Sequence, residues 1–237
     1  MDTIELFSGT GSFSRVALER GHSIVTVDNA KEADELAWGT HLRADISKLS
    51  INRAGLESYD MCWASPPCQA FSVASVSHHW FKPPTDEQFR EDNPGCDLAP
   101  QPISDKARDA LALVERTLML IRYQIRPEIF FIENPRGMLR KVIDPLFEMV
   151  GMYGAYPTIH RHTVTYCQYG DDRMKPTDIW TNHPTWVPKP MCKRGSPCHV
   201  AAPRGSSTGT QGIKSARDRS RIPRLIFDEI FDLSQDG

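Results

Sequence analysis

Short runs of β-branched and aromatic residues alternate with helical patterns through residues 3–135, and this alternation limits the fold more than any other feature. The expected strands are residues 3–7, 23–28, 59–64 and 128–135, and the expected helices are residues 12–21, 31–42 and 103–125. Strands separated by helices at this spacing predict a doubly wound α/β fold, with a mostly parallel sheet covered on both faces. In such sheets ligands bind at the carboxyl ends of the strands. Asp28, Cys68 and Glu133 fall at or just after expected strand ends, so they are the first candidates for a site.

The composition is that of a globular protein. A chain of 237 residues with 40% hydrophobic and 24% charged residues can bury the core of one large domain. No apolar run is long enough to span a membrane, and the N-terminal residues show no signal-peptide pattern. Six cysteines in such a chain indicate reduced thiols and not a disulfide framework. We therefore expect a cytoplasmic protein that acts as a monomer.

Two regions interrupt the alternation. Residues 73–104 are polar and rich in proline, without periodicity, and long loops of this kind inside compact domains are functional or disordered. Residues 184–222 contain too few apolar residues for a core of their own, so they need a staple or a partner. We accordingly expect a catalytic domain in residues 1–183, a small basic segment in residues 184–220, and a C-terminal helix in residues 221–237 that packs on the domain.

Basic residues concentrate in the second of these regions. Between Pro184 and Arg224 the only acidic residue is Asp218, although the whole chain has a net charge of −2. The basic residues of this stretch are Lys189, Lys193, Arg194, Arg204, Lys214, Arg217, Arg219, Arg221 and Arg224. A basic stretch on an acidic body is a candidate surface for a polyanion, although charge alone also fits a solvated loop.

The stretch ELFSGTGSFS follows an expected strand and begins a helix, which is the position that a glycine-rich nucleotide loop requires. Gly9 and Gly11 let the backbone approach a ligand closely, while Ser14 stands at the third glycine position of the dinucleotide pattern. Asp28 ends the next strand, where a carboxylate can accept hydrogen bonds from a ribose. The loop alone also fits a plain tight turn, but together with Asp28 it indicates an adenosine-containing cofactor.

Cys68 follows two prolines in ASPPCQAFS, directly after an expected strand. Pro66 and Pro67 stiffen the backbone, so the turn fixes the position of the thiol, as a nucleophile requires. A thiol with an ordinary pKa of about 8.5 is only partly ionised at neutral pH and needs help to react. Glu133, in FFIENPRG, provides a carboxyl group that can protonate an electron-poor ring while sulfur adds to it.

ELFSGTGSFS, ASPPCQAFS and FFIENPRG follow one another in an order that resembles the DNA cytosine-5 methyltransferases. In that family the corresponding segments are the S-adenosylmethionine loop, the catalytic Pro-Cys-Gln loop and a Glu-Asn strand end. LRADI, at residues 42–46, is similar to the segment that presents an aspartate to the adenine of the cofactor. The resemblance covers residues 1–182 and, more loosely, the final helix. It implies a Rossmann-like S-adenosylmethionine-dependent methyltransferase, in a compact member of bacterial or phage type.

The resemblance implies a covalent reaction on a cytosine that is flipped out of duplex DNA. Cys68 would attack C6 while Glu133 engages N3, and C5 would then accept the methyl group. The implied catalytic residues are Cys68, Glu133, Asn134, Arg173 and Lys175. The implied cofactor-binding residues are Phe7, Ser8, Gly9, Thr10, Gly11, Ser12, Asp28, Asn29, Asp45, Ile46 and Pro67. Residues 73–104 would close over the DNA. The methylation of this DNA would be part of a restriction–modification system.

The sequence departs from the family pattern in three places. Arg173 and Lys175 stand where two arginines are expected, and lysine lacks the fork of a guanidinium group. The usual Gly-Asn pair near the C-terminus is not evident. The target-recognition region is compressed into residues 184–220, and its few base-edge contacts predict a short or relaxed target sequence.

The basic segment also contains MCKRGSPCHV, which provides Cys192, Cys198 and His199, while Cys167 ends an expected strand upstream. Three thiols and an imidazole suit a structural zinc ion, and a metal would supply the staple that this segment lacks. The spacing differs from a Cys-x-x-Cys knuckle, so ordinary free thiols are the alternative, and His183 is a substitute ligand.

Three other functions stay open from the sequence. The tRNA-acting branch of the same family also has a Pro-Pro-Cys-Gln loop, and a basic segment fits RNA as well as DNA. Enzymes that methylate exocyclic amines have Ser-Pro-Pro followed by an aromatic residue, but Cys68 and the Glu133–Asn134 pair argue against that chemistry. The intact Cys68, Glu133 and glycine loop also argue against a non-catalytic nucleic-acid-binding protein.

Overall fold

The computed structural model describes residues 1–34, 39–51, 58–82, 91, 99–193, 195–201, 213 and 215–234. Its centre is a seven-stranded sheet in the order β3-β2-β1-β4-β7-β9-β8. The strands are β1 (Asp2–Leu6), β2 (Ser23–Asp28), β3 (Thr40–Arg43), β4 (Met61–Ala64), β7 (Ile129–Pro135), β8 (His160–Thr165) and β9 (Pro176–Thr181). The first four strands and β7 pair in parallel, and β9 runs antiparallel to β7 and β8. The predicted doubly wound, mostly parallel sheet is confirmed.

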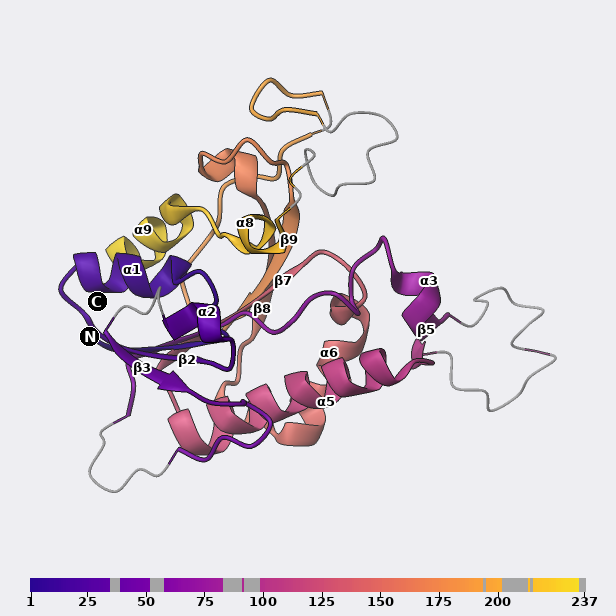
Figure 1. Cartoon of the computed structure of the whole chain (residues 1–237), viewed down its shortest axis with the longest axis horizontal. Coiled ribbons are helices and arrows are strands. Elements are labelled where there is room, and N and C mark those ends of the chain that lie inside the picture. Colours follow the sequence, from indigo (N-terminus) through magenta and orange to yellow (C-terminus); the bar gives the residue numbers. More distant parts are fainter. Residues whose placement is uncertain are drawn as a thin grey trace.

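Helices cover both faces of this sheet. They are α1 (Ser12–Glu19), α2 (Lys31–Asp34), α3 (Val76–His79), α5 (Asp105–Met119), α6 (Leu139–Val150), α7 (Met152–Ala155), α8 (Ala216–Ser220) and α9 (Arg224–Leu233), with a π-helical turn η1 (Leu120–Ile125) and a 3₁₀ turn η2 (Tyr166–Tyr169). Figure 1 shows α1 beside α9 on one side of the sheet and α5 beside α6 on the other. Within the described residues, none of the helices combines the length and apolar character that crossing a membrane requires.

Strand alternation divides the apolar residues between two cores. Trp63 and Phe131 face the layer of α1 and α9, where Phe13 stacks on Trp63 with ring centroids 5.9 Å apart. Cys62 and Phe130, the preceding residues on the same two strands, lie in the opposite core with α5 and α6. This is the two-residue period of a strand that is covered on both faces. The expected packing of the C-terminal helix on the domain is seen in α9, whose apolar face is buried against α1.

Residues 40–43 differ from the sequence expectation, which placed residues 31–42 in one helix. Thr40–Arg43 form the edge strand β3, which pairs with β2 from Val25 to Asp28. Pairing with an existing strand outweighs the local helical pattern here, because strand preference depends strongly on the neighbours that a strand finds. Residues 35–38 of the expected helix lie outside the described residues.

Residues 73–104 also contain more regular structure than expected. Val76–His79 form α3, and Trp80–Phe81 (β5) pair antiparallel with Gln101–Pro102 (β6). The fully buried indole of Trp80 donates to the Ala70 carbonyl at 2.8 Å, which anchors this hairpin beside the Cys68 turn. Residues 83–90 and 92–98, the middle of the expected DNA-closing loop, lie outside the described residues.

Candidate active site

The candidate residues collect where the strand order of the sheet reverses, between β1 and β4. The loop after β1 contains Gly9 and Gly11, and the turn after β4 contains Cys68. The neighbouring parallel strands β2 and β7 carry Asp28 and Glu133 near their carboxyl ends. In open α/β sheets this reversal leaves a crevice at the carboxyl edge, and ligands bind there.

The loop after β1 has an unusual backbone. Phe7, Gly9 and Gly11 have φ angles of 60°, 44° and 65°, in the left-handed region that glycine adopts without strain. Gly11 is the residue from which α1 begins. The Gly9 N–H donates to Asp28 Oδ2 at 2.9 Å, which ties the loop to the end of β2. The expected glycine loop therefore lies directly against the expected ribose-binding carboxylate.

Two carboxylates line the β2–β3 side of this edge. Asp28 Oδ1 accepts from the Ala30 N–H at 2.8 Å, and carboxylate oxygens can each accept a further hydrogen bond. Asp45 follows β3 and accepts from the hydroxyl and the N–H of Ser47 at 2.8 and 2.9 Å. These hydrogen bonds lower the pKa of Asp45, so it is ionised at neutral pH. The other predicted residues on this side are the exposed Asn29 and the buried Ile46.

An arginine-lined cavity of about 270 Å³ lies at the other end of the glycine loop. Its walls are Thr10, Gly11, Ser12, Arg15, Val16, Arg217, Arg221, Ile222 and Arg224. The Ile222 N–H donates to Ser12 Oγ at 3.3 Å, so the segment before α9 returns to the loop. The sequence did not reveal this contact, because it joins positions 210 residues apart and no Gly-Asn pair marks it.

Cys68 is partly exposed on the turn after β4. The Asn134 amide donates from Nδ2 to the Pro66 carbonyl at 2.9 Å, which fastens this turn to the end of β7. The chain after β7 then passes against Phe71, whose carbonyl accepts from the Met138 N–H at 2.8 Å. The predicted catalytic Asn134 is therefore a structural link between the two loops of the site.

Gly137 makes the close approach of these two loops possible. A Cβ atom at this position would lie 2.2 Å from the Phe71 carbonyl oxygen, which is shorter than any normal contact between two non-bonded heavy atoms. A glycine is therefore required to keep the Cys68 turn in contact with the chain that follows Glu133. FFIENPRG contained this residue, but its sequence gave no sign of the Phe71 contact.

Glu133 is only 5% exposed and accepts from the Tyr166 hydroxyl at 3.0 Å. Burial raises the pKa of Glu133, although Lys175 and hydrogen bonds from Tyr166 and Ser65 act in the opposite direction. A carboxyl group with a raised pKa keeps its proton closer to neutral pH, as a general acid requires. Tyr166 was missed by sequence reasoning, because its partner is 33 residues away and no local pattern joins them.

The Cys68 thiol shares the electrostatic environment of Glu133. Burial raises the pKa of Cys68, and the negative charge of Glu133 raises it further, whereas Lys175 and Arg219 lower it. Lys175 lies with Nζ 4.7 Å from the centre of the Tyr166 ring and donates to the Arg219 carbonyl at 3.1 Å. The fold therefore brings Cys68, Glu133 and Lys175 together, as predicted, and adds Tyr166 and Arg219.

The structure does not leave the Arg173 side chain free to contact a base. It is 4% exposed, and all five of its side-chain N–H groups have partners. The guanidinium group pairs with Asp171 and donates to the backbone carbonyls of Asp218, Arg219 and Arg221 at 3.1, 3.0 and 2.9 Å. Arg173 thus holds residues 218–221, at the end of α8, against the catalytic domain.

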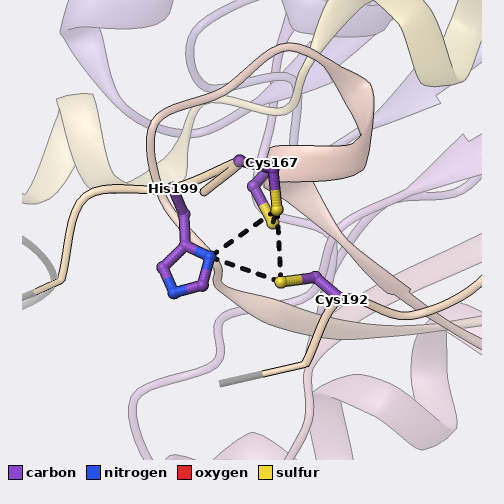
Figure 2. Close-up of side chains that lie close together, drawn as sticks. Cys167, Cys192 and His199 are labelled. Atoms are coloured by element: carbon purple, nitrogen blue, oxygen red, sulfur yellow. Dashed lines mark hydrogen bonds between the residues drawn. The ribbon is translucent and has the colours of Figure 1, made fainter. Parts of the chain in front are cut away.

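Cys167, Cys192, Cys198 and His199 form a separate cluster, with their ligand atoms within 4.8 Å of one another. Figure 2 shows Cys167, Cys192 and His199 pointing toward a common centre. Cys167 comes from η2, and the others come from a segment without helix or strand. His183 is not part of the cluster, because its Nδ1 accepts from the N–H groups of Thr185 and Trp186.

Sequence comparison relates the chain to one enzyme family. The model of the C-5 cytosine-specific DNA methylases matches residues 1–85. A protein of Frog virus 3 (isolate Goorha), named as a probable DNA (cytosine-5)-methyltransferase, is 30% identical over an alignment of 252 residues. This alignment covers 98% of the chain and 100% of the viral protein.

One solved structure supports the fold, and a second is similar over part of the chain. A prophage-encoded E. coli protein assigned as a DNA modification methyltransferase aligns with a TM-score of 0.50 at 18% identity, over 76% of this chain and 46% of that one. DNMT2 of Spodoptera frugiperda aligns with a TM-score of 0.48 at 18% identity, over 79% of this chain and 52% of that one. The chain thus spans about half the length of these solved structures.

Proposed function

The chain belongs to the C-5 cytosine-specific DNA methylase family, and from that membership we propose that it transfers a methyl group from S-adenosylmethionine to C5 of cytosine in DNA. The observation that carries the proposal is the placement of Cys68 after β4 and of Glu133 near the end of the neighbouring strand β7, at the same sheet edge as the glycine loop. A thiol nucleophile, a buried acid and a nucleotide-type loop at one sheet edge are the groups that this reaction needs.

We propose that Cys68 sulfur donates the electron pair of a new bond to C6 of the cytosine. The C5=C6 electron pair shifts to C4=C5, the C4=N3 electron pair moves onto N3 and takes a proton from Glu133, and C5 becomes nucleophilic. When bound, S-adenosylmethionine would supply an electrophilic methyl group, which C5 accepts with the C4=C5 electron pair as C4=N3 re-forms, and S-adenosylhomocysteine would leave. Loss of the C5 proton to a base then re-forms the C5=C6 bond, expels Cys68 as a thiolate and returns the N3 proton to Glu133.

The reactive protonation state follows from the mutual effects of the two side chains. An ionised Glu133 raises the pKa of Cys68, but a protonated Glu133 carries no charge and removes that effect. Burial still raises the pKa of Cys68, whereas Lys175 and Arg219 lower it and so favour the thiolate. A thiolate beside a neutral carboxylic acid is also the state in which Glu133 has a proton for N3.

The residues around the glycine loop fit the cofactor. Gly9 and Gly11 admit a ligand next to the backbone, and Asp28 and Asp45 offer acceptors for ribose hydroxyl and adenine amino groups. The arginine-lined cavity at the other end of the loop suits the carboxylate of the methionine part. The remaining proposed contacts are Phe7, Ser8, Thr10, Ser12, Asn29, Ile46 and Pro67.

We propose that the target cytosine leaves the stack of duplex DNA, because C5 and C6 are not accessible to a thiol inside the helix. The basic segment of residues 184–220 would contact the phosphates, and α8 places Arg217 and Arg219 near the glycine loop and the thiol respectively. Residues 194, 202–212 and 214 of that segment lie outside the described residues. The small size of the segment favours a short target sequence.

A methyl-transfer assay tests the reaction and the substrate together. The protein is incubated with S-adenosylmethionine labelled with tritium in the methyl group and with duplex DNA, single-stranded DNA or tRNA, and the labelled base is identified. We expect 5-methylcytosine in duplex DNA. Label in tRNA alone would assign the substrate to RNA, and label on an exocyclic amine would refute addition of the thiol.

A covalent trap tests the role of Cys68 directly. Duplex DNA containing 5-fluorocytosine should give a protein–DNA complex that survives denaturing electrophoresis, because fluorine at C5 is not lost as a proton. Cys68→Ser should abolish both the complex and methyl transfer, while calorimetric binding of S-adenosylmethionine is retained. Cys62→Ala, which removes a thiol from the core, is the matched control and should still form the complex.

A further inference from the structure

The side chains of Cys167, Cys192, Cys198 and His199 are placed as the ligands of one metal ion. We propose that they bind a structural Zn²⁺, and that this ion fastens the segment of residues 192–199 to η2. Through residues 171–175 it also orders the basic residues beside the catalytic thiol. Metal binding is independent of the proposed methyl transfer, whereas its effect on DNA binding rests on that function.

The distances within the cluster match a tetrahedral Cys₃His site. Zn–S bonds of about 2.3 Å and Zn–N bonds of about 2.0 Å place two sulfurs ~3.8 Å apart and a sulfur ~3.5 Å from the nitrogen. Cys198 Sγ lies 3.7 Å from Cys167 Sγ and 3.4 Å from Cys192 Sγ. His199 Nδ1 lies 3.3 Å from Cys192 Sγ and 3.7 Å from Cys198 Sγ. These four distances differ from the tetrahedral values by a few tenths of an ångström, and all four ligand atoms lie within 4.8 Å of one another.

The donor set indicates a structural role for the ion. Four protein ligands fill a tetrahedral zinc site and leave no position for water or substrate. The Gln168 amide donates from Nε2 to Cys198 Sγ at 3.3 Å, as partners of metal-bound thiolates do. Cys167 and Cys192 are each 7% exposed, so the site is shielded from solvent on one side.

Among the described residues, the stretch of residues 187–200, which carries three of the ligands, has few other anchors. The backbone N–H groups of Lys189, Cys192 and Val200 donate to Tyr169 Oη, Thr165 Oγ1 and the Asp172 carbonyl at 2.8, 2.9 and 3.0 Å. Its side chains Val187 and Val200 are largely exposed, so apolar burial contributes little. The free energy of binding a structural zinc ion stabilises segments that lack a core in this way.

The cluster connects to the active site through a short length of chain. Cys167 is followed by Asp171, which pairs with Arg173, and by Lys175, which lies over Tyr166. Arg173 and Lys175 together hold the carbonyls of residues 218, 219 and 221. Loss of the ion should therefore loosen the basic residues at the thiol, while Asp28 and Asp45 on the far side of the glycine loop keep their contacts.

Metal content of the full chain, purified under reducing conditions without added metal, tests the site. We expect about one zinc per chain by elemental analysis. Cys192→Ser and Cys198→Ser should each lower the zinc content at least tenfold, whereas Cys68→Ser, the matched thiol control for metal content, should keep it. His199→Ala should lose the ion and His199→Cys should regain it. Cobalt substitution should give the strong absorption of tetrahedral thiolate coordination, which weakens with each cysteine removed.

Several results would overturn the proposal. A folded, metal-free chain whose thermal midpoint is unchanged by added Zn²⁺, or a zinc content unaffected by both cysteine variants, would rule out the site. A Cys192–Cys198 disulfide found by mass spectrometry in freshly purified, unreduced protein would assign the cluster to redox chemistry instead. The connection to the active site predicts that chelation weakens binding of duplex DNA at least tenfold. Equal DNA affinity with and without the ion would refute that connection.

Discussion

The two sulfur-containing regions of this protein are assembled in opposite ways. Cys68 follows β4 and Glu133 lies on β7, and the parallel pairing of these strands, with Ala64 opposite Ile132, sets their relative position. The Cys/His cluster instead joins η2 to a segment without regular structure, and its members contact one another directly. A lone thiol stays available for reaction because the sheet holds its turn in place. Where no sheet does this, the side chains themselves must provide the cross-link.

Arg173 is the point at which the two regions meet. It lies between the cluster and the active site along the chain, and its guanidinium group holds the end of α8. We therefore expect three kinds of substitution to differ in effect. Some affect the reaction and leave the fold intact, some affect the connection between the Cys/His cluster and the active site, and some affect the sheet and the loops at its edge.

The largest expected effect is that of Glu133→Gln, which changes chemistry alone. Glutamine keeps an acceptor for the Tyr166 hydroxyl but has no proton to donate to N3, so kcat should fall by about 10²–10⁴-fold. The alkaline limb of the pH–rate profile should disappear with the acid, while zinc content and thermal midpoint stay within error. Steady-state kinetics between pH 5 and 10 measure this. Glu148→Gln, on the exposed side of α6, is the control and should match the wild type.

The next largest effect is expected for Arg173→Met, which removes the interactions that join the two regions. Asp171 loses its paired guanidinium group, and the carbonyls of residues 218, 219 and 221 each lose the hydrogen bond from Arg173, so the free energy of unfolding should fall by roughly 3–5 kcal/mol. Urea denaturation measures the loss, and amide hydrogen exchange should rise in residues 216–223. Arg140→Met breaks a comparable pair with Asp178 elsewhere in the sheet. Arg140→Met should lower the free energy of unfolding without raising amide hydrogen exchange in α8. Equal exchange in α8 of both variants would show that Arg173 does not hold this helix in place.

The free energy of unfolding should depend on pH through Glu5, which supports the end of the glycine loop. Glu5 on β1 accepts from the N–H groups of Phe13 and Ser14 at the start of α1, and burial raises the pKa of Glu5 from 4.5 to about 7. Between these pH values the folded state holds a proton that the unfolded chain releases, so stability falls as pH rises from 4.5 to 7. The loss should be on the order of 3 kcal/mol, and it is complete above pH 7.

Denaturant unfolding of wild type and Glu5→Gln across pH 4.5–8 isolates this contribution, because other titrating groups are common to both proteins. The difference in unfolding free energy between the two should increase in favour of Glu5→Gln as pH rises. A difference that is constant with pH would show that Glu5 is ionised throughout the range.

The smallest expected effect is that of Gly137→Ala, which pushes apart the two loops of the site. The new Cβ would meet the Phe71 carbonyl, and relief of this contact should cost about 1–3 kcal/mol of stability. Displacement of the Cys68 turn should also lower kcat with little change in S-adenosylmethionine affinity. Gly154→Ala, in α7 where nothing lies within 4 Å of the added atom, is the matched control. If both alanines are tolerated equally, the close approach at Phe71 has no functional importance.

Local sequence patterns were sufficient for the frame of the protein. The alternation of strands and helices predicted β1, β2, β4 and β7 and their parallel arrangement, and ELFSGTGSFS, ASPPCQAFS and FFIENPRG lie at the carboxyl ends of β1, β4 and β7. Such predictions succeed because side-chain period and turn chemistry are properties of a few consecutive residues. Residues 40–43 were expected in a helix but form β3, since an edge strand depends on the partner it meets, and the bounds of α6, β8 and β9 were not predicted.

Contacts between remote segments were decided only by the tertiary structure. Nothing local assigns Tyr166 to Glu133, Ile222 to Ser12, or Arg173 to the carbonyls of residues 218, 219 and 221. The four members of the Cys/His cluster could be named from the sequence, but only folding brings their ligand atoms within 4.8 Å. The sequence specifies which chemical groups are present, whereas the distance between two side chains depends on the path of all the residues between them.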